Sequence, residues 1–319
     1  MHEYDFFNED LLCTLAGATG EDDVLMSEPM SQHTTFKIGG AADVMVTPRS
    51  IDAAKRVLDI CNRTEIPLTI VGNGSDLLVG DRGIRGVVML FSDNLSDITV
   101  EGDRVIAEAG ALLRDAALAA ADAGLSGLEP LWGIPASIGG ACFMNAGAYD
   151  ACMSDVLESV KCYVPGRKDE QGVCGGGSIL DFDVDELNMG YRKSRIADEG
   201  WTVLSATFKL APGNVAMIKA DMDSYQQKRE EKQPLDMPSA GSTFKRPEGY
   251  FAGKLIMDAG LRGYAVGGAQ VSEKHCGFVV NADHATAAEV NELIEHVQSE
   301  VKRQFDVDLE PEVRRIGEF

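Results

Sequence analysis

The sequence has few of the features that mark secreted, membrane-spanning or zinc-binding proteins. Its 319 residues include only five His, and its seven Cys form no CxxC pair, so no zinc-ligand spacing is present. An odd number of cysteines favours reduced thiols over a disulfide framework. The start of the chain is acidic where a secretory signal is basic, and no apolar run approaches a membrane span. We therefore expect a cytoplasmic protein without a bound metal.

Positive charge is also scarce. The chain has 29 Lys and Arg against 51 Asp and Glu, a formal charge of −22. Such acidity argues against nucleic acid and anionic membranes as partners, but a locally basic pocket could still bind a small anion. The length predicts two or three domains with a sizeable core.

The most unusual stretch is LWGIPASIGGACFMNAGAYD, residues 131–150, in which Gly and Ala recur and Asp150 is the only charge. It shows neither helical nor strand periodicity, so we expect irregular backbone. Small residues let the backbone approach a partner closely, with N–H groups as ligands. Ser137, Asn145 and Tyr149 could add hydrogen bonds. The alternative is a tight turn between packed elements.

A second glycine-rich loop, GNGSDLL at residues 72–78, follows the short apolar run Leu68 to Val71. A glycine-rich turn after a strand presents successive N–H groups to an anion. The loop is neither a Walker A sequence, which needs GK[ST], nor a Rossmann GxGxxG. On its own it is a weak indication of phosphate binding.

The remaining pattern predicts alternating helices and strands. We expect two strands joined by a Gly-Gly turn over 33–46, and a helix capped by Ser50 with Ala54, Val57, Leu58 and Cys61 on its buried face. The strand at 68–71 then completes a β-α-β unit with parallel pairing. Further on we expect a polar turn at 166–177, a linker at 211–213, a helix begun by the Thr286–Glu289 capping box, and a closing strand over 307–317.

Seven segments, taken in order, resemble the UDP-N-acetylenolpyruvoylglucosamine reductases, the MurB family. They run from about His33 to the C-terminus and are TTFKIGG, VGNGSDLLVGDRGIRGVV, GIPASIGGACFMNAGAY, GYRKSR, AGSTFKRP, GGAQVSEKH and PEVRRIG. The short connection between AGSTFKRP and GGAQVSEKH is similar to the shorter type of this family, which lacks an extra tyrosine-bearing loop.

The resemblance implies an α+β fold with an FAD-binding module of the vanillyl-alcohol-oxidase (PCMH) type in two subdomains, followed by an α+β substrate-binding domain. We expect an N-terminal helix and loop at 1–32, the FAD module at 33–212 with subdomains of about 33–92 and 93–212, and the substrate domain at 213–319. The implied reaction is the NADPH-dependent, FAD-mediated reduction of UDP-N-acetyl-3-O-(1-carboxyvinyl)-glucosamine (UDP-GlcNAc-enolpyruvate) to UDP-N-acetylmuramate for peptidoglycan. The FAD would be non-covalent and the protein a monomer.

The resemblance also implies which residues bind FAD. The 72–77 loop would hold the diphosphate and the 133–147 segments would line the flavin and its ribityl chain. Ala136 stands where the family often has Gly, and Asp76 where it more often has Asn. Because a carboxylate would repel a diphosphate, only the backbone of Asp76 is expected to contact one. The implied set is Gly72, Asn73, Gly74, Ser75, Asp76, Leu77, Gly133, Ile134, Pro135, Ser137, Ile138, Gly139, Gly140, Asn145, Ala146 and Gly147.

Three residues match the catalytic positions of the family. Arg192 would stabilise the enolate that forms on the substrate carboxylate, and Ser242 would protonate the α carbon. Glu312 would orient or stabilise the intermediate, with Glu310 as the alternative two residues away. Tyr191 would frame the flavin site, and the implied substrate-binding residues are Tyr191, Lys245, Arg246, Gln270 and Lys274.

Several other interpretations are compatible with single motifs. Ser242 could be a turn residue, and Arg192 or Glu312 a solvated surface charge. The chain could also be another FAD-dependent oxidoreductase of the same fold, where Cys142 is a conceivable flavin tether, or a non-catalytic UDP-sugar or flavin-binding protein.

Overall fold

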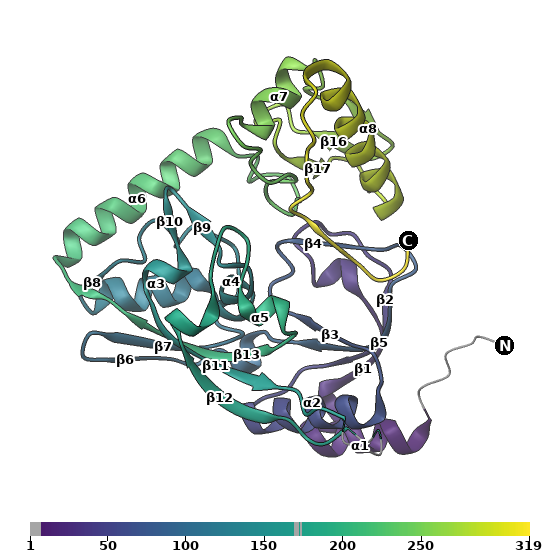
Figure 1. The fold of residues 1–319 in the computed structure, drawn as a ribbon, viewed down its shortest axis with the longest axis vertical. Coiled ribbons are helices and arrows are strands. Elements are labelled where there is room, and N and C mark those ends of the chain that lie inside the picture. The colour runs from purple at the N-terminus through teal and green to yellow at the C-terminus, as the bar shows by residue number, and fades with distance from the viewer. Residues whose placement is uncertain (1–7, 169–171, 173) are drawn as a thin grey trace. The chain divides into compact units, whose positions relative to one another are not determined.

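The computed structural model describes residues 8–168, 172 and 174–319 (Figure 1). Within this part no helix is long and apolar enough to cross a membrane. Residues 1–7 of the expected N-terminal segment, and 169–171 and 173 of the expected turn at 166–177, lie outside the described residues. The described residues divide into two compact units: one contains those up to Met26 and those within Val44–Asn73 and Gly86–Gln227, the other Ser27–Asp43, Gly74–Arg85 and Lys228–Phe319.

The division differs from the boundary expected at 212/213. The segment Ala211–Pro212, expected as a linker, forms strand β14 against β8, and most of the helix after it belongs to the first unit. The helices are α1 Glu9–Thr19, α2 Ile51–Thr64, α3 Leu113–Asp122, α4 Ile138–Met144, α5 Arg195–Asp198, α6 Val215–Lys232, α7 Ala252–Asp258 and α8 Ala287–Phe305.

The strands form one four-stranded sheet, one five-stranded sheet and smaller pairings. Their bounds are β1 Val24–Pro29, β2 Ala41–Val46, β3 Leu68–Val71, β4 Leu77–Val79, β5 Ile84–Leu90, β6 Ile98–Glu101, β7 Arg104–Glu108, β8 Leu125–Ser126, β9 Gly147–Ala148, β10 Ala151–Cys152, β11 Leu157–Val164, β12 Ser178–Asp183, β13 Thr202–Lys209, β14 Ala211–Pro212, β15 Ala265–Val266, β16 Ala269–Val271, β17 Val279–Asn281 and β18 Arg314–Ile316.

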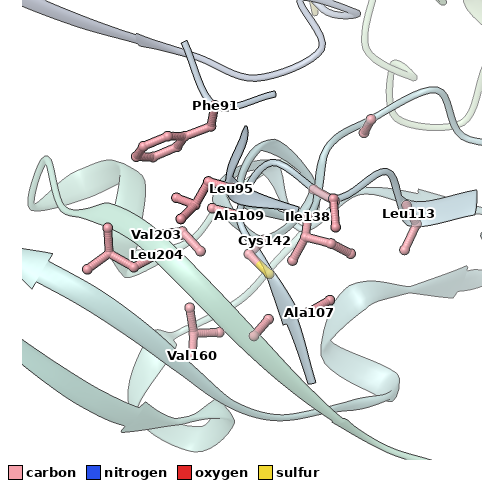
Figure 2. Packing of buried hydrophobic residues seen from close by; sticks show 14 of the residues in the cluster. Phe91, Leu95, Ala107, Ala109, Leu113, Ile138, Cys142, Val160, Val203 and Leu204 are labelled. Atoms are coloured by element: carbon pink, nitrogen blue, oxygen red, sulfur yellow. The ribbon is translucent and has the colours of Figure 1, made fainter. Parts of the chain in front are cut away.

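The first unit is built on the five-stranded antiparallel sheet, whose strand order is β12-β11-β13-β7-β6. Helix α3 contacts β6 and β7, and α4 contacts β7 and β13. Figure 2 shows Ile138 and Cys142 of α4 among the side chains of this core, and both are fully buried. Burying such apolar surface is the main stabilising term for the unit.

Helix α2 forms as its sequence predicts. Ser50 caps it by accepting a hydrogen bond from Ala53 N at 3.1 Å, and the four residues expected on the inner face are all buried. The β-α-β unit is corrected in one respect. The strand order β1-β2-β5-β3 places β5 between β2 and β3, so the parallel partner of β3 is β5.

The second unit places α7 and α8 against each other and α8 against β15 and β16 of the antiparallel sheet β15-β16-β17. The Thr286–Glu289 capping box is confirmed, and Val290, Leu293, Ile294, Val297 and Val301 are fully buried as expected. The carboxylate of Asp81 adds two more bonds at this helix end, from Ala287 N at 2.7 Å and Ala288 N at 2.9 Å. In the same unit β4 pairs in parallel with β18.

Three sequence-based expectations are wrong. The 131–150 stretch contains helix α4, with Ser137 as its N-cap. Residues 33–38 form no strand. The Thr34 hydroxyl instead holds them in a turn, because it donates to Ile38 O at 3.0 Å and accepts from Ile38 N at 3.3 Å. The expected strand over 307–317 is reduced to β18, preceded by one bridge between Phe244 and Pro311.

Candidate flavin and substrate site

The loop that follows β3 requires glycine at two positions. A Cβ on Gly72 would lie 2.0 Å from Ser137 Oγ. Gly74 has φ +60°, and a Cβ there would lie 2.1 Å from His33 O. The side chain of Asn73 donates to Pro135 O at 2.6 Å, so the two expected flavin segments contact each other within the first unit.

The same loop has backbone donors available for a ligand. In the described part of the chain, the backbone N–H groups of Asn73, Gly74 and Ser75 donate to no protein acceptor. Successive N–H groups without a protein acceptor suit the oxygens of a phosphate. A diphosphate such as that of FAD therefore fits this loop.

The glycines at the start of α4 have a different use. Ile138 N donates to Ala111 O and Gly139 N to Ala109 O, both at 2.8 Å, while Gly140 N reaches Ser137 Oγ at 3.4 Å. A Cβ on Gly139 would lie 3.1 Å from the Cβ of Ala109. These glycines bring α4 close to the sheet, and their N–H groups donate to acceptors within the chain. We therefore expect this segment to contact a ligand by van der Waals packing and not by N–H donors.

Helix α4 ends in a small hairpin that also belongs to the predicted flavin segment. Asn145 is the left-handed C-cap of α4, and Gly147 begins β9, which pairs with β10. A Cβ on Gly147 would lie 2.6 Å from Ala151 O, so the pairing requires glycine there. Asn145 is 4% exposed, and its side-chain amide donates to Gly190 O and accepts from Ser154 N.

The basic segment GYRKSR separates its three cations. Tyr191 and Arg192 occupy the tip of a tight turn closed by Gly190 N to Lys193 O at 2.9 Å and the reverse bond at 3.2 Å. Arg192 has φ +54°, and its guanidinium carbon lies 5.0 Å from the centre of the Tyr191 ring.

The other two cations of the segment have structural contacts. Arg195 stacks on Trp201 at 4.7 Å, and Lys193 pairs with Asp198 at 3.6 Å. Of the three cations, Arg192 alone lies at the tip of the strained turn, as a residue with a functional role often does.

In the second unit the predicted acid and carboxylate lie on neighbouring segments. Glu312 N donates to Thr243 O at 2.8 Å, and Lys245 N donates to Glu310 O at 2.9 Å. Thr243 N in turn donates to Gly277 O at 2.8 Å, which fixes the residue after Ser242. Because Thr243 follows Ser242 and its carbonyl bonds to Glu312, Ser242 and Glu312 lie on neighbouring segments. Ser242 itself is exposed.

The same pairing distinguishes the two candidate glutamates. The carboxylate of Glu310 is 70% exposed and forms an ion pair with the ammonium of Lys245. Glu310 therefore already serves as the ion-pair partner of Lys245. The half-buried Glu312 remains the better candidate for a role in the reaction.

Two of the predicted substrate-binding residues line a hollow of about 620 Å³ in the second unit. Gln270 and Lys274 are joined there by three carboxylates and apolar residues, namely Glu230, Asp236, Glu273, Pro234, Leu235 and Met237, and by Ser272. Three carboxylates against one ammonium do not favour binding of the substrate's diphosphate at Lys274. A neutral sugar or uracil would suit this lining better.

The structure adds one supporting residue that the sequence did not reveal. Thr35 N donates to Gly74 O at 3.2 Å, and its hydroxyl donates to Ser239 O at 2.7 Å. Thr35 therefore joins the phosphate loop to the segment that leads to Ser242. The TTFKIGG motif contains Thr35, but its sequence pattern predicts a strand, which the structure does not form there. The predicted residue Arg246 stacks on Phe251, with its guanidinium carbon 4.1 Å from the ring centre.

Comparison with known proteins gives two family matches along the chain. Residues 42–166 match the family described as FAD binding domain, and residues 233–316 match that described as UDP-N-acetylenolpyruvoylglucosamine reductase, C-terminal domain. These matches, with the mixed helix and sheet structure, confirm the expected α+β class with an FAD-binding module.

Whole-chain relatives agree with the two matches. UDP-N-acetylenolpyruvoylglucosamine reductase of Clostridium beijerinckii is 50% identical over 298 residues, covering 93% of this chain and 94% of the relative. The protein of that name from Clostridium botulinum is 50% identical over 299 residues, covering 94% of each. The crystal structure of UDP-N-acetylenolpyruvylglucosamine reductase (MurB) from Thermus caldophilus matches with a TM-score of 0.75 at 34% identity, covering 92% of this chain and 97% of that one. The chain therefore belongs to the UDP-N-acetylenolpyruvoylglucosamine reductase family.

Proposed function

We propose that this chain performs its family's reaction with Arg192, Ser242 and Glu312 as the catalytic residues. The chain is an FAD-dependent oxidoreductase of peptidoglycan precursor synthesis, and it uses NADPH to reduce UDP-GlcNAc-enolpyruvate to UDP-N-acetylmuramate. The backbone hydrogen bond between Glu312 and Thr243 is the observation that best supports the assignment, because it joins the segment of the proton donor to that of the carboxylate.

When bound, FAD would supply the chemistry that transfers a hydride from NADPH to the β carbon of the enolpyruvyl group. The backbone N–H groups of Asn73, Gly74 and Ser75 would hold its diphosphate, with Gly72, Asp76 and Leu77 completing the loop through their backbone. Gly133, Ile134, Pro135, Ser137, Ile138, Gly139 and Gly140 would line the flavin, together with Asn145, Ala146 and Gly147.

Arg192 would meet the substrate carboxylate. Negative charge builds on this carboxylate as the enolate forms, and a fixed cation placed there lowers the energy of the transition state. The planar guanidinium can donate two parallel hydrogen bonds to it, which an ammonium cannot.

Ser242 would donate the proton that the α carbon needs. A hydroxyl is a weak acid in water, but the enolate is a strong base. Lys245, three residues on, would favour loss of the proton, and Glu312 would orient the intermediate. Tyr191 and Arg246 would bind the substrate, while Gln270 and Lys274 would contact its neutral parts in the hollow.

A different flavoenzyme of the same fold would often tether its FAD through Cys or His. Cys142 is 0% exposed in the core, and burial raises the pKa of its thiol, so it is not available as a nucleophile. This supports non-covalent FAD. We also propose that the protein acts as a monomer in the cytoplasm, where its seven free thiols stay reduced.

Two measurements test the proposed function. The purified protein should be yellow, and acid precipitation should release all of its flavin. NADPH oxidation should then depend on UDP-GlcNAc-enolpyruvate and produce UDP-N-acetylmuramate, detected by mass. Flavin that stays with the precipitated chain would indicate a tether and favour another oxidoreductase. A bound flavin without substrate-dependent turnover would favour a binding protein.

A further inference from the structure

Two hydrogen bonds hold the Arg192 turn to the C-terminal end of α4, one on each side of the turn. Asn145 Nδ2 donates to Gly190 O at 3.0 Å, and Ser194 Oγ donates to Phe143 O at 2.6 Å. Helix α4 also contacts α5, which begins directly after Ser194. The backbone around Arg192 is therefore fixed to the element that we expect to line the flavin.

The amide of Asn145 is used within the chain at both of its ends. Oδ1 accepts from Ser154 N at 3.0 Å, and Nδ2 reaches Ser154 Oγ at 3.4 Å in addition to Gly190 O. The residue is 4% exposed and has φ +45°, a left-handed conformation that Asn tolerates well. Its side chain thus offers a donor and an acceptor at a buried left-handed position, a combination that suits Asn.

The turn that these bonds hold is itself strained. Arg192 has φ +54°, in the region that residues with a Cβ rarely occupy. Such a conformation persists where the surroundings over-determine it. The bonds to Gly190 and Ser194, on either side, supply that restraint.

We propose that Asn145 is a positioning residue for Arg192: its amide sets the Arg192 turn relative to the flavin segment. The inference rests on the proposed role of Arg192. It assigns the side chain of Asn145 to the reduction of the enolpyruvyl substrate, and leaves only its backbone for the flavin.

Asn145→Asp tests this with little other change. Aspartate tolerates the left-handed conformation and keeps the acceptor for Ser154 N, but it loses the donor to Gly190 O. Reoxidation of reduced flavin by UDP-GlcNAc-enolpyruvate should slow about tenfold or more. Reduction by NADPH should stay within about twofold and the FAD dissociation constant within about threefold, because these steps do not use Arg192.

Matched variants separate this role from general packing. Ser154→Ala removes the long 3.4 Å contact to the same Nδ2 but keeps the Gly190 bond, so both half-reactions should match wild type. Ser194→Ala removes the bond to Phe143 O on the other side of the turn, together with the N-cap bond from Ala197 N, and should reproduce the selective slowing. In a double-mutant cycle, Asn145→Asp should add little to Arg192→Lys, which has already lost the two-pronged geometry.

The outcomes distinguish the inference from the proposed function. Arg192→Lys with wild-type reoxidation would overturn the role of Arg192 and the inference with it. If Arg192→Lys is slow, then wild-type rates in Asn145→Asp, additive effects in the cycle, or loss of FAD from Asn145→Asp would each overturn only the inference. Selective slowing that is not additive would establish it.

Discussion

Gly74 shows how much a single residue without a side chain can determine. Its φ of +60° disfavours any Cβ, and its neighbour His33 O leaves no room for one. The left-handed conformation alone costs a residue with a Cβ roughly 1–2 kcal/mol. The collision adds a displacement of the loop whose N–H groups we assign to the diphosphate.

Gly74→Ala should therefore weaken FAD binding by about tenfold or more, equivalent to about 1.4 kcal/mol. Gly102→Ala is the matched control, because Gly102 has φ +63° but nothing within 4 Å of its added Cβ. Titration of the apoprotein by flavin fluorescence measures both. Equal FAD affinity in the two variants would show that the 72–77 loop does not hold the cofactor.

At the scale of elements, the β9–β10 hairpin turns through two left-handed residues that are not glycine. Tyr149 has φ +52° and Asp150 φ +63°, at positions where Asn-Gly is usual. Tyr149 is held there by Tyr225 of α6. Its hydroxyl donates to Tyr225 O at 3.2 Å, and the two ring centres are 4.8 Å apart.

Asp150→Gly should raise the free energy of unfolding by about 1 kcal/mol, because glycine adopts this conformation without steric cost. Urea denaturation followed by circular dichroism gives the value. Asp103→Gly, in a turn residue that does not have positive φ, should instead destabilise the protein. Destabilisation by both substitutions would show that the hairpin tip is not left-handed.

Helix α2 is joined to the β11–β12 strands by the buried carboxylate of Asp59. Oδ1 accepts from Tyr163 Oη at 2.9 Å and from Gly177 N at 2.8 Å, and Oδ2 pairs with Lys55 at 2.6 Å. Burial alone would raise the pKa of Asp59. The bonds from Lys55, Gly177 and Tyr163 outweigh it, so the pKa lies below its ordinary value.

A lowered pKa in the folded state means that Asp59 stabilises the protein above its unfolded pKa and loses this contribution as pH falls through the folded value. Asp59→Asn should cost about 2 kcal/mol at pH 7, and the difference from wild type should shrink below about pH 4. Asp181→Asn, at an exposed pair with Lys161, should cost under about 1 kcal/mol. A gap between Asp59→Asn and wild type that widens in acid would contradict this.

Sequence patterns predicted elements whose signal is local. The capping residues Ser50 and Thr286 and the apolar faces behind them are read directly from spacing, and both helices form as expected. Helix α4 escaped prediction because seven residues that pack closely against the sheet show no polar face. The closing strand was overestimated, because only contacts distant in sequence decide how far it pairs.

The same distinction between local signals and distant contacts applies to the candidate site. Glycine-rich loops and the order of motifs indicated the flavin and the catalytic residues. The Asn145–Gly190 hydrogen bond and the Lys245–Glu310 ion pair join residues 45 and 65 positions apart. The acidic lining around Lys274 likewise includes Glu230 and Asp236 from another segment. No spacing rule connects such segments, so their roles could not be read from the sequence.

At the scale of the whole molecule, the chain passes repeatedly between its two units. Arg192 and α4 belong to the first, and Ser242 and Glu312 to the second. The reaction consists of two half-reactions. Reduction of the flavin by NADPH needs no carbon acid, whereas reduction of the substrate needs a proton at the α carbon.

The most direct test of this account is anaerobic stopped-flow absorbance of the flavin in Ser242→Ala, run once for each half-reaction. Bleaching by NADPH should stay close to wild type. Reoxidation by UDP-GlcNAc-enolpyruvate should slow by about a hundredfold or more, the usual scale for one general acid, and Ser242→Cys should recover part of the loss. Equal slowing of both half-reactions, or no slowing of the second, would contradict Ser242 as the proton donor.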